Sequence, residues 1–258
     1  MSKNLLNPIL SEKINIVLVG CGRISKNHFK AIIENINNFN LIGICDNNEN
    51  NLIEAKSFIN EISTEKKLLI DPYLFKNFDN LIFKIKKKEL KVDLIVLATP
   101  SGMHPSQVKM AASAGVNVCT EKPMAVKYID GKAMVEACKC AGVKLFVVKQ
   151  NRFNKTLQLV KKQLDNGRFG NLSLITVNVF WQRPQTYYDL DKWRGTWELD
   201  GGALMNQASH YVDLLSWMIG PLKKISASIS TIGRNIEVEN NAVIQMSWVN
   251  GAIGTMAV

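Results

Sequence analysis

Up to Gln150, the chain alternates between short apolar runs rich in β-branched residues and longer segments whose apolar positions recur at helical spacing. The short runs predict strands at Ile14–Val19, Leu41–Cys45, Val92–Ala98, Val116–Thr120 and Lys144–Val148. The longer segments predict helices at Ile24–Asn35, Asn51–Ile62, Asp79–Glu89, Pro105–Ala114 and Lys127–Ala141. Because the predicted strands are apolar throughout, both faces of their sheet should be covered, as in a parallel sheet. We therefore predict a doubly wound α/β domain over residues 1–149.

After Gln150 the elements no longer alternate. Predicted helices lie at Lys155–Asn166 and Ala203–Ile219, with a polar and aromatic loop, Gln182–Asp200, between them. Predicted strands lie at Leu172–Trp181, Leu222–Thr231, Asn241–Val249 and Ala252–Val258. Since the last three strands follow one another without helices, we predict a second, α+β domain over residues 150–258 with a mostly antiparallel sheet. Its last predicted strand ends with the chain.

Composition excludes several classes of protein. The 258 residues are 47% hydrophobic and 21% charged, as in ordinary globular proteins. No apolar run approaches the roughly 20 residues that a membrane helix needs, and Met1–Lys13 lacks the features of a secretory signal. The five cysteines are scattered and odd in number, which argues against a disulfide framework or a metal site. We expect a cytoplasmic protein.

The net charge of +10 raises the question of a polyanionic partner. Only six of the 32 basic residues are arginines, and the lysines are spread along the whole chain. The densest run, Lys84–Lys91, shares a predicted helix with Leu81, Ile82 and Ile85, so it is interpreted as a solvated helix surface. We expect neither nucleic acid nor a membrane as partner, but a small anionic substrate would be attracted by this charge.

A glycine-rich turn follows the first predicted strand and opens the first predicted helix. Gly20 permits the tight turn, Gly22 lets the backbone approach a pyrophosphate, and Ser25 replaces the third glycine of the usual pattern. Arg23 and Ile24 complete the turn. Asp46 ends the second strand, where a carboxylate accepts hydrogen bonds from an adenosine ribose and repels a 2′-phosphate. This Rossmann arrangement predicts NAD as cofactor; the alternative is a structural glycine turn beside a surface aspartate.

Two further segments lie at the carboxyl ends of predicted strands, where an open parallel sheet binds its ligand. Ala98–Pro105 follows the third strand, and Thr120–Pro123 follows the fourth. Together with Gln150, they supply these expected cofactor-binding residues: Thr99, Pro100, Ser101, His104, Glu121, Lys122 and Gln150. Each residue alone is also explained as an ordinary surface or loop residue.

The predicted helix Ala203–Ile219 carries one polar stripe on an otherwise apolar surface. Asn206, His210 and Asp213 are spaced to lie on one helix face. The alternative is a structural role, with His210 as a core histidine that hydrogen-bonds Asp213. The preceding Gly201–Gly202 turn and the polar loop upstream of it favour a substrate site instead.

The Gly-x-Gly turn, the Ala-Thr-Pro-x-x-x-His-Pro loop and Glu-Lys-Pro resemble the glucose–fructose oxidoreductase/inositol dehydrogenase/rhizopine-catabolism (Gfo/Idh/MocA) family. The resemblance covers essentially the whole chain. Members of this family are usually longer, so we expect the C-terminal part of the second domain to be missing. The resemblance implies a nicotinamide-dependent sugar or polyol dehydrogenase in which Lys122 and His210 are catalytic, and a homo-oligomer, although the shortened chain makes the oligomer doubtful. Glu121 and His104 are implied to contact the cofactor or support the pocket. Asn206 departs from the aspartate of the inositol dehydrogenases.

The second half resembles one subgroup, the dehydrogenases that oxidise the 3″-hydroxyl of UDP-N-acetylglucosaminuronic acid in the synthesis of bacterial surface polysaccharides. Such a sugar nucleotide carries a diphosphate and a carboxylate, which suit planar guanidinium groups. The expected substrate-binding residues are Arg152, Arg183, Tyr187, Tyr188, Arg194, Asn206 and Gln207. Surface salt bridges and packing are their ordinary alternatives. Another sugar or inositol dehydrogenase, or a non-catalytic NAD-binding regulator, remains open as the function.

Overall fold

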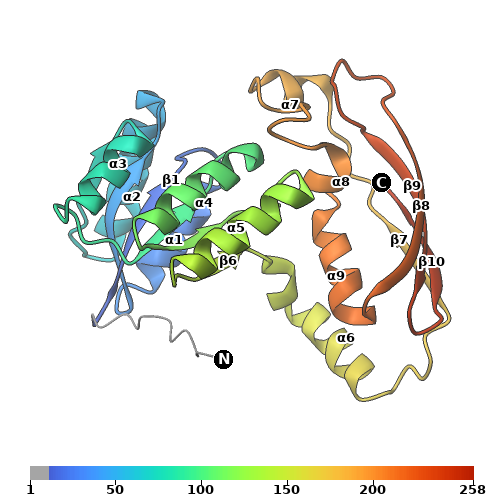
Figure 1. The fold of residues 1–258 in the computed structure, drawn as a ribbon. Helices are drawn as coiled ribbons and strands as arrows, with labels where there is room; N and C mark the ends of the chain where they lie inside the picture. Colours follow the sequence, from blue (N-terminus) through green and yellow to red (C-terminus); the bar gives the residue numbers. More distant parts are fainter. Residues whose placement is uncertain (1–11) are drawn as a thin grey trace. The chain divides into compact units, whose positions relative to one another are not determined.

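The computed structural model describes residues 12–258 and divides into two compact units, Met1–Val147 and Val148–Val258 (Figure 1). Nearly all of the N-terminal stretch inspected above for a secretory signal lies outside the described residues. Each unit has its own sheet and its own apolar core.

The first unit is built on a six-stranded parallel sheet in the order β3-β2-β1-β4-β5-β6. The strands are β1 (Ile14–Val19), β2 (Phe39–Cys45), β3 (Tyr73–Phe75), β4 (Leu94–Leu97), β5 (Asn117–Thr120) and β6 (Leu145–Val147). All adjacent pairs are parallel. The predicted doubly wound fold is confirmed, and the short edge strand β3 is an addition that the sequence pattern did not indicate.

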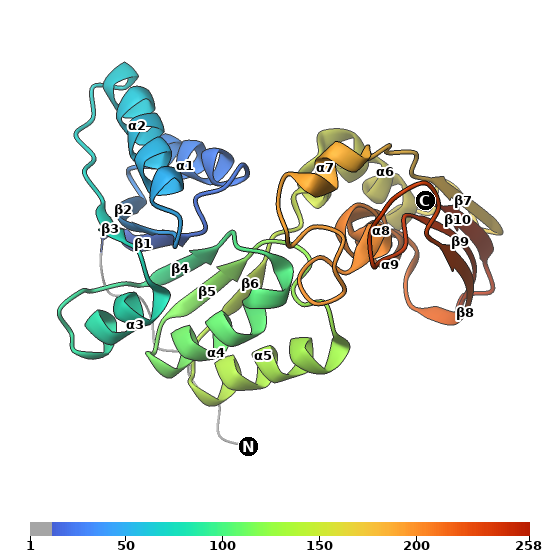
Figure 2. The ribbon, with the colours of Figure 1, turned by 90° about the horizontal axis from the view of Figure 1, so that it is seen from above.

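Helices cover both faces of this sheet (Figure 2). On one face lie α1 (Ser25–Glu34) and α2 (Glu49–Glu65), and on the other lie α3 (Phe78–Lys86), α4 (His104–Ser113) and α5 (Tyr128–Cys140). Successive residues of a strand point to opposite faces. Accordingly, Ile16 and Leu18 of β1 pack with Phe29 of α1, whereas Val17 and Val19 join the core on the other face. Burial on both faces explains the uninterrupted apolar runs of the central strands.

The second unit combines a four-stranded mixed sheet with helices. After the 3₁₀ turn η2 (Gln150–Phe153), its elements are α6 (Lys155–Asp165), β7 (Leu174–Asn178), α7 (Gln185–Asp189), α8 (Gly202–Asn206), α9 (Ser209–Ile219), β8 (Leu222–Ser230), β9 (Asn241–Trp248) and β10 (Ile253–Ala257). The strand order is β7-β10-β9-β8, with only the β7–β10 pair parallel. Alternate residues of β9, including Met246 and Trp248, pack with Ala208 and Leu215 in the core. The predicted α+β architecture is confirmed.

One predicted element is wrong in form: Ala203–Ile219 is two helices, not one. The backbone N–H of Ala208 donates to the carbonyl of Ala203 at 2.8 Å, five residues back instead of four. The Ser209 hydroxyl also donates to the carbonyl of Asn206 at 3.3 Å. This shift in the hydrogen-bond ladder separates Asn206 from the helix that carries His210. The three residues of the predicted stripe therefore do not share one continuous helix face.

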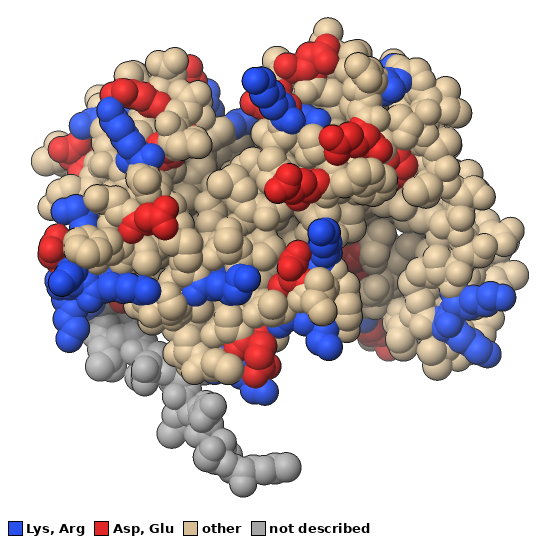
Figure 3. All heavy atoms as spheres, turned by 45° about the horizontal axis from the view of Figure 1, so that its top comes forward, with Lys and Arg blue, Asp and Glu red and all other residues tan. Residues whose placement is uncertain are grey.

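Surface charge and hydropathy mark no binding site on the described part of the chain. Lys and Arg alternate with Asp and Glu over the face shown in Figure 3 and form no continuous basic patch there. Within residues 12–258, no helix combines the length and the apolar character needed to cross a membrane. The same residues contain no group of three or more His, Cys, Asp or Glu side chains that could hold a metal ion.

Candidate functional site

The glycine turn lies where β1 gives way to α1, at the carboxyl end of the central strand. Gly20 has φ +93°, and a Cβ there would lie 2.6 Å from the carbonyl carbon and oxygen of Ala98. Glycine is required at this position because the loop after β4 passes directly against it. Gly22 differs, since among the described residues no atom beyond its chain neighbours would come within 4 Å of its Cβ. The backbone around Gly22 is therefore accessible from outside.

Asp46 follows β2 and holds the glycine turn. Its Oδ2 accepts a 2.7 Å hydrogen bond from the backbone N–H of Cys21, and its Oδ1 accepts one of 2.8 Å from the N–H of Asn48. Oδ2 also accepts from the side-chain amide of Asn51 at 3.3 Å, so Oδ1 is the oxygen that can accept a further hydrogen bond. Asp46 thus sits beside the glycine turn, where it was predicted to receive a ribose hydroxyl.

His104 ties two loops together at the sheet edge. One ring nitrogen lies 3.1 Å from the carbonyl oxygen of Pro123, and the other lies 3.0 Å from that of Thr99. The residue has no exposed surface, and burial lowers the pKa of its imidazole. Of the two roles expected for His104, the geometry favours support of the pocket over direct contact with a cofactor. Ser101 beside it is also buried, and the Thr99 hydroxyl donates to Gln107.

Glu121 and Lys122 follow β5 in the loop that also contains Pro123. A ring nitrogen of His28, on α1, lies 2.9 Å from Glu121 Oε1, and the Lys122 N–H donates to Glu121 Oε2 at 3.1 Å. Burial alone would raise the pKa of Glu121, but the His28 hydrogen bond and the nearby charges outweigh it, so the pKa lies below its usual range. His28 was missed from the sequence, because its position on α1 gave no signal that it faces the Glu-Lys-Pro loop.

These residues fit a dinucleotide at the carboxyl edge of the sheet. The first turn of α1 carries no side-chain cap, and Gly22, Arg23 and Ile24 are exposed before it. Backbone N–H groups and the positive end of a helix dipole bind phosphate groups at such a place. Asp46 beside the turn supplies acceptors for a ribose. Gln150, the remaining expected contact, lies exposed at the start of η2 in the second unit.

Two buried carboxylates hold the segment that carries Asn206. Asp200 accepts hydrogen bonds from the N–H of Gly195 at 2.8 Å and from the side-chain amide of Asn206. Because a carboxylate only accepts, this bond turns the amide nitrogen of Asn206 toward Asp200. Glu239 accepts from the N–H of Leu204 at 2.9 Å, and burial raises its pKa. Neither acid was predicted to belong to the site. Asp200 lies in a loop without a periodic pattern, and Glu239 is distant in sequence from Leu204, which it binds.

Asp213 binds an arginine, a partner that the sequence did not indicate. Arg152 donates from Nε and Nη2 to the two oxygens of Asp213, at 2.7 Å each, and Lys149 Nζ lies 3.8 Å away. Asp213 is thus bound by Arg152, and the predicted contact between Asp213 and the imidazole of His210 stays a prediction. His210 itself is buried near the start of α9.

We expect Arg152→Ala to destabilise the second unit by about 1–2 kcal/mol, because it leaves the partly buried Asp213 with only the distant Lys149. The Arg152 side chain is 38% exposed, so solvent screening keeps the loss at the lower end of this range. Thermal unfolding measures it. Asp213→Asn and the double variant should show losses that do not add. Additive losses would contradict the pairing, and Arg168→Ala, at an exposed arginine, is the control.

The loop Gln182–Asp200 is held by stacked arginines and aromatic rings. The guanidinium carbon of Arg194 lies 4.4 Å from the ring centre of Tyr187, and its Nε donates to Asp191 at 2.9 Å. The guanidinium carbon of Arg183 also lies 5.1 Å from the ring centre of Tyr187. Tyr188 is buried, which raises the pKa of its hydroxyl. Arg194 and Tyr188 thus serve the loop itself, and their contact with a substrate stays a prediction.

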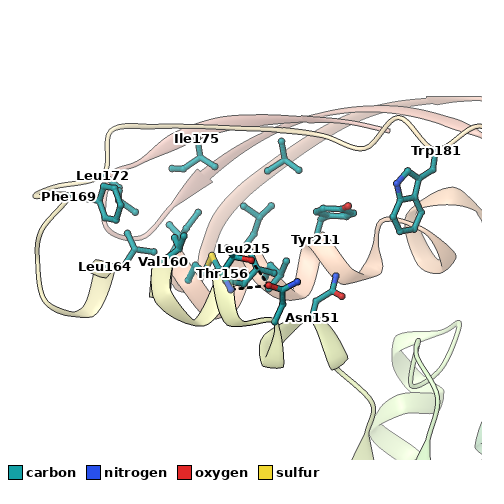
Figure 4. A pocket seen from close by; sticks show the side chains of 16 residues that line it. Asn151, Thr156, Val160, Leu164, Phe169, Leu172, Ile175, Trp181, Tyr211 and Leu215 are labelled. Atoms are coloured by element: carbon teal, nitrogen blue, oxygen red, sulfur yellow. Dashed lines mark hydrogen bonds between the residues drawn. The ribbon is translucent and has the colours of Figure 1, made fainter. Parts of the chain in front are cut away.

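Gln207 is buried, and an apolar cavity lies elsewhere in the second unit. Gln207 is 6% exposed, and its buried side-chain oxygen has no hydrogen-bond partner among the described residues. A cavity of about 680 Å³ lies between α6, α9 and β7 (Figure 4). Its walls are mostly apolar, with Leu164, Leu215 and Ile175 among them, and no predicted site residue lines it. An apolar cavity of this kind does not suit a charged sugar nucleotide.

Comparison with known proteins connects these features. The model of an oxidoreductase family with an NAD-binding Rossmann fold (GFO/IDH/MocA) matches residues 14–149, and that of the GFO/IDH/MocA C-terminal domain matches residues 157–258. The chain is 27% identical to a D-apiose dehydrogenase of Paraburkholderia graminis over 91% of its length, and spans 57% of that relative.

Two solved structures are more similar. The WlbA dehydrogenase of Bordetella pertussis, in complex with NADH and UDP-GlcNAcA, is 49% identical over 95% of this chain and 72% of its own, with a TM-score of 0.87. The WlbA dehydrogenase of Chromobacterium violaceum, in complex with the same two molecules, is 44% identical over 98% and 69%, with a TM-score of 0.89. With family models matching both units, the chain belongs to the GFO/IDH/MocA family of oxidoreductases.

Proposed function

We propose that this chain is an NAD-dependent dehydrogenase that oxidises the 3″-hydroxyl of UDP-N-acetylglucosaminuronic acid, a step in the synthesis of bacterial surface polysaccharides. The observation that carries this proposal is the 44–49% identity to two WlbA dehydrogenases described with NADH and UDP-GlcNAcA, extending over nearly the whole chain. The Asp46 carboxylate beside the glycine turn supports NAD over its 2′-phosphorylated form.

In the proposed mechanism, oxidation removes a proton from the hydroxyl oxygen and a hydride from C3. Bound NAD supplies the acceptor for the hydride. His210 takes the proton, and Lys122 hydrogen-bonds the same oxygen and stabilises its developing negative charge. Asn206 receives the substrate hydroxyl through its side-chain oxygen, since its nitrogen faces Asp200. Glu121, bound to His28, holds the loop that carries Lys122.

The test is a single-turnover measurement of NADH absorbance after mixing the protein, NAD and UDP-N-acetylglucosaminuronate. One equivalent of NADH is expected, and a single turnover prevents slow cofactor release from masking the reaction. UDP-N-acetylglucosamine, myo-inositol and D-apiose are the comparison substrates. NADH formation only with an unactivated sugar would overturn the substrate assignment. NAD binding without any NADH formation would favour a non-catalytic regulator.

A further inference from the structure

Two neighbouring arginines of the second unit have no carboxylate partner among the described residues. Arg183 lies in the loop after β7, and Arg234 lies between β8 and β9. The Nε of Arg234 donates to the backbone carbonyl of Arg183 at 2.6 Å, which brings the two loops together. By contrast, Arg152 and Arg194 are paired with Asp213 and Asp191. Positive charge that is brought together without a counter-ion favours the binding of an anion.

Arg183 is held in place but not saturated. Its guanidinium carbon lies 5.6 Å from the ring centre of Trp181 and 5.1 Å from that of Tyr187. Its Nη1 donates to the carbonyl of Gln182 at 3.3 Å, whereas its buried Nε has no hydrogen-bond partner in the described part of the chain. A buried donor left without an acceptor is unfavourable. The two rings therefore fix the plane of the guanidinium group, and its Nε still lacks an acceptor.

The two loops are fixed relative to each other by Gln185. Its Oε1 accepts from the N–H of Asn235 at 2.9 Å, and its Nε2 donates to the carbonyl of Asn235 at 3.4 Å. The charges of Arg183 and Arg234 both act on the Tyr188 hydroxyl: burial and Asp200 raise the pKa of Tyr188, and the two arginines oppose that rise. Both positive charges thus reach the same small region.

We propose that Arg183 and Arg234 together bind the diphosphate of a nucleoside-diphosphate sugar; this rests on the proposed function. A diphosphate offers negative charge on two linked phosphorus centres, whereas a carboxylate offers a single charge that one guanidinium satisfies. The two arginines match the diphosphate in number of charges and in planar hydrogen-bonding shape. Arg234 was not among the residues expected from the sequence to contact a substrate.

Calorimetric titration with UDP and UMP tests the assignment without requiring turnover. We expect Arg234→Ala and Arg183→Ala each to weaken UDP binding by about 10- to 100-fold, and UMP binding by about threefold or less. Arg183→Lys keeps the positive charge and is the control for a structural effect of Arg183→Ala. It should retain part of the affinity for UDP. Arg168→Ala is the matched control and should bind UDP like the parent chain.

Unchanged UDP affinity in Arg234→Ala, equal losses for UDP and UMP, or no UDP binding by the parent chain would overturn the assignment. Turnover separates it from the proposed function. If UDP binding depends on both arginines but UDP-N-acetylglucosaminuronate gives no NADH, the diphosphate site stands and the proposed function fails. If NADH forms and KM in Arg234→Ala is unchanged, the function stands and the diphosphate site fails.

Discussion

Replacing Lys122 by Met should lower kcat by about 10³-fold while leaving NAD affinity within about twofold, since one preorganised donor to a developing oxyanion contributes roughly 10²–10³ in rate. Met keeps most of the apolar stem of the lysine and removes the ammonium group, with its positive charge and its N–H donors. Glu121 retains its hydrogen bond from His28, so the loop that holds position 122 should keep its shape. The measurement is the single-turnover rate of NADH formation at saturating NAD and UDP-N-acetylglucosaminuronate.

Lys91→Met is the control for this substitution, because Lys91 is an exposed lysine of the same unit. It should react at the parent rate. A Lys122→Met variant that binds NAD and still turns over within tenfold of the parent would remove Lys122 from the proposed chemistry. If the variant lost both NAD binding and turnover, Lys122 would instead have a role in holding the cofactor.

The strands of the first unit were predictable because burial on both faces leaves an unbroken apolar run. β3 was missed for the same physical reason: only Phe75 of its three residues is buried, so no run marks it. The break between α8 and α9 was also invisible in the pattern. The carboxylate of Glu239, distant in sequence, binds the N–H of Leu204 and occupies the space beside Gly202, so it holds the start of α8. Helical spacing alone cannot report such a contact.

The candidate site divides in the same way. The position of Asp46 beside the turn that contains Gly20 was predictable, because a strand–turn–helix unit of this kind fixes where these residue types stand. The partners that orient other site residues were not recognisable, as His28 beside Glu121 and Asp200 beside Asn206 illustrate. Hydrogen bonds between segments leave no periodic trace in one sequence. Arg152 illustrates the opposite case. Its residue type suggested contact with an anionic substrate, whereas the fold pairs it with Asp213.

Alanine at Gly20 and alanine at Gly22 should separate stability from cofactor binding. Gly20→Ala is expected to destabilise the first unit by about 2–4 kcal/mol, because φ of +93° strains an L-residue and the new Cβ would lie 2.6 Å from the backbone of Ala98. Neither backbone can yield without moving β1 or β4. Thermal unfolding in the absence of NAD measures this loss, which at this size corresponds to a shift of several degrees.

Gly22→Ala should leave the unfolding midpoint nearly unchanged, within about 0.5 kcal/mol, since its Cβ would meet no other atom of the described chain and its φ is not positive. Its NAD affinity should nevertheless fall by about tenfold or more, because the methyl group projects toward the place where the glycine turn receives a pyrophosphate. A Gly22→Ala protein with parental stability and parental NAD affinity would contradict the assignment of this turn to the cofactor. A stability loss equal to that of Gly20→Ala would mean that Gly22 serves the fold instead.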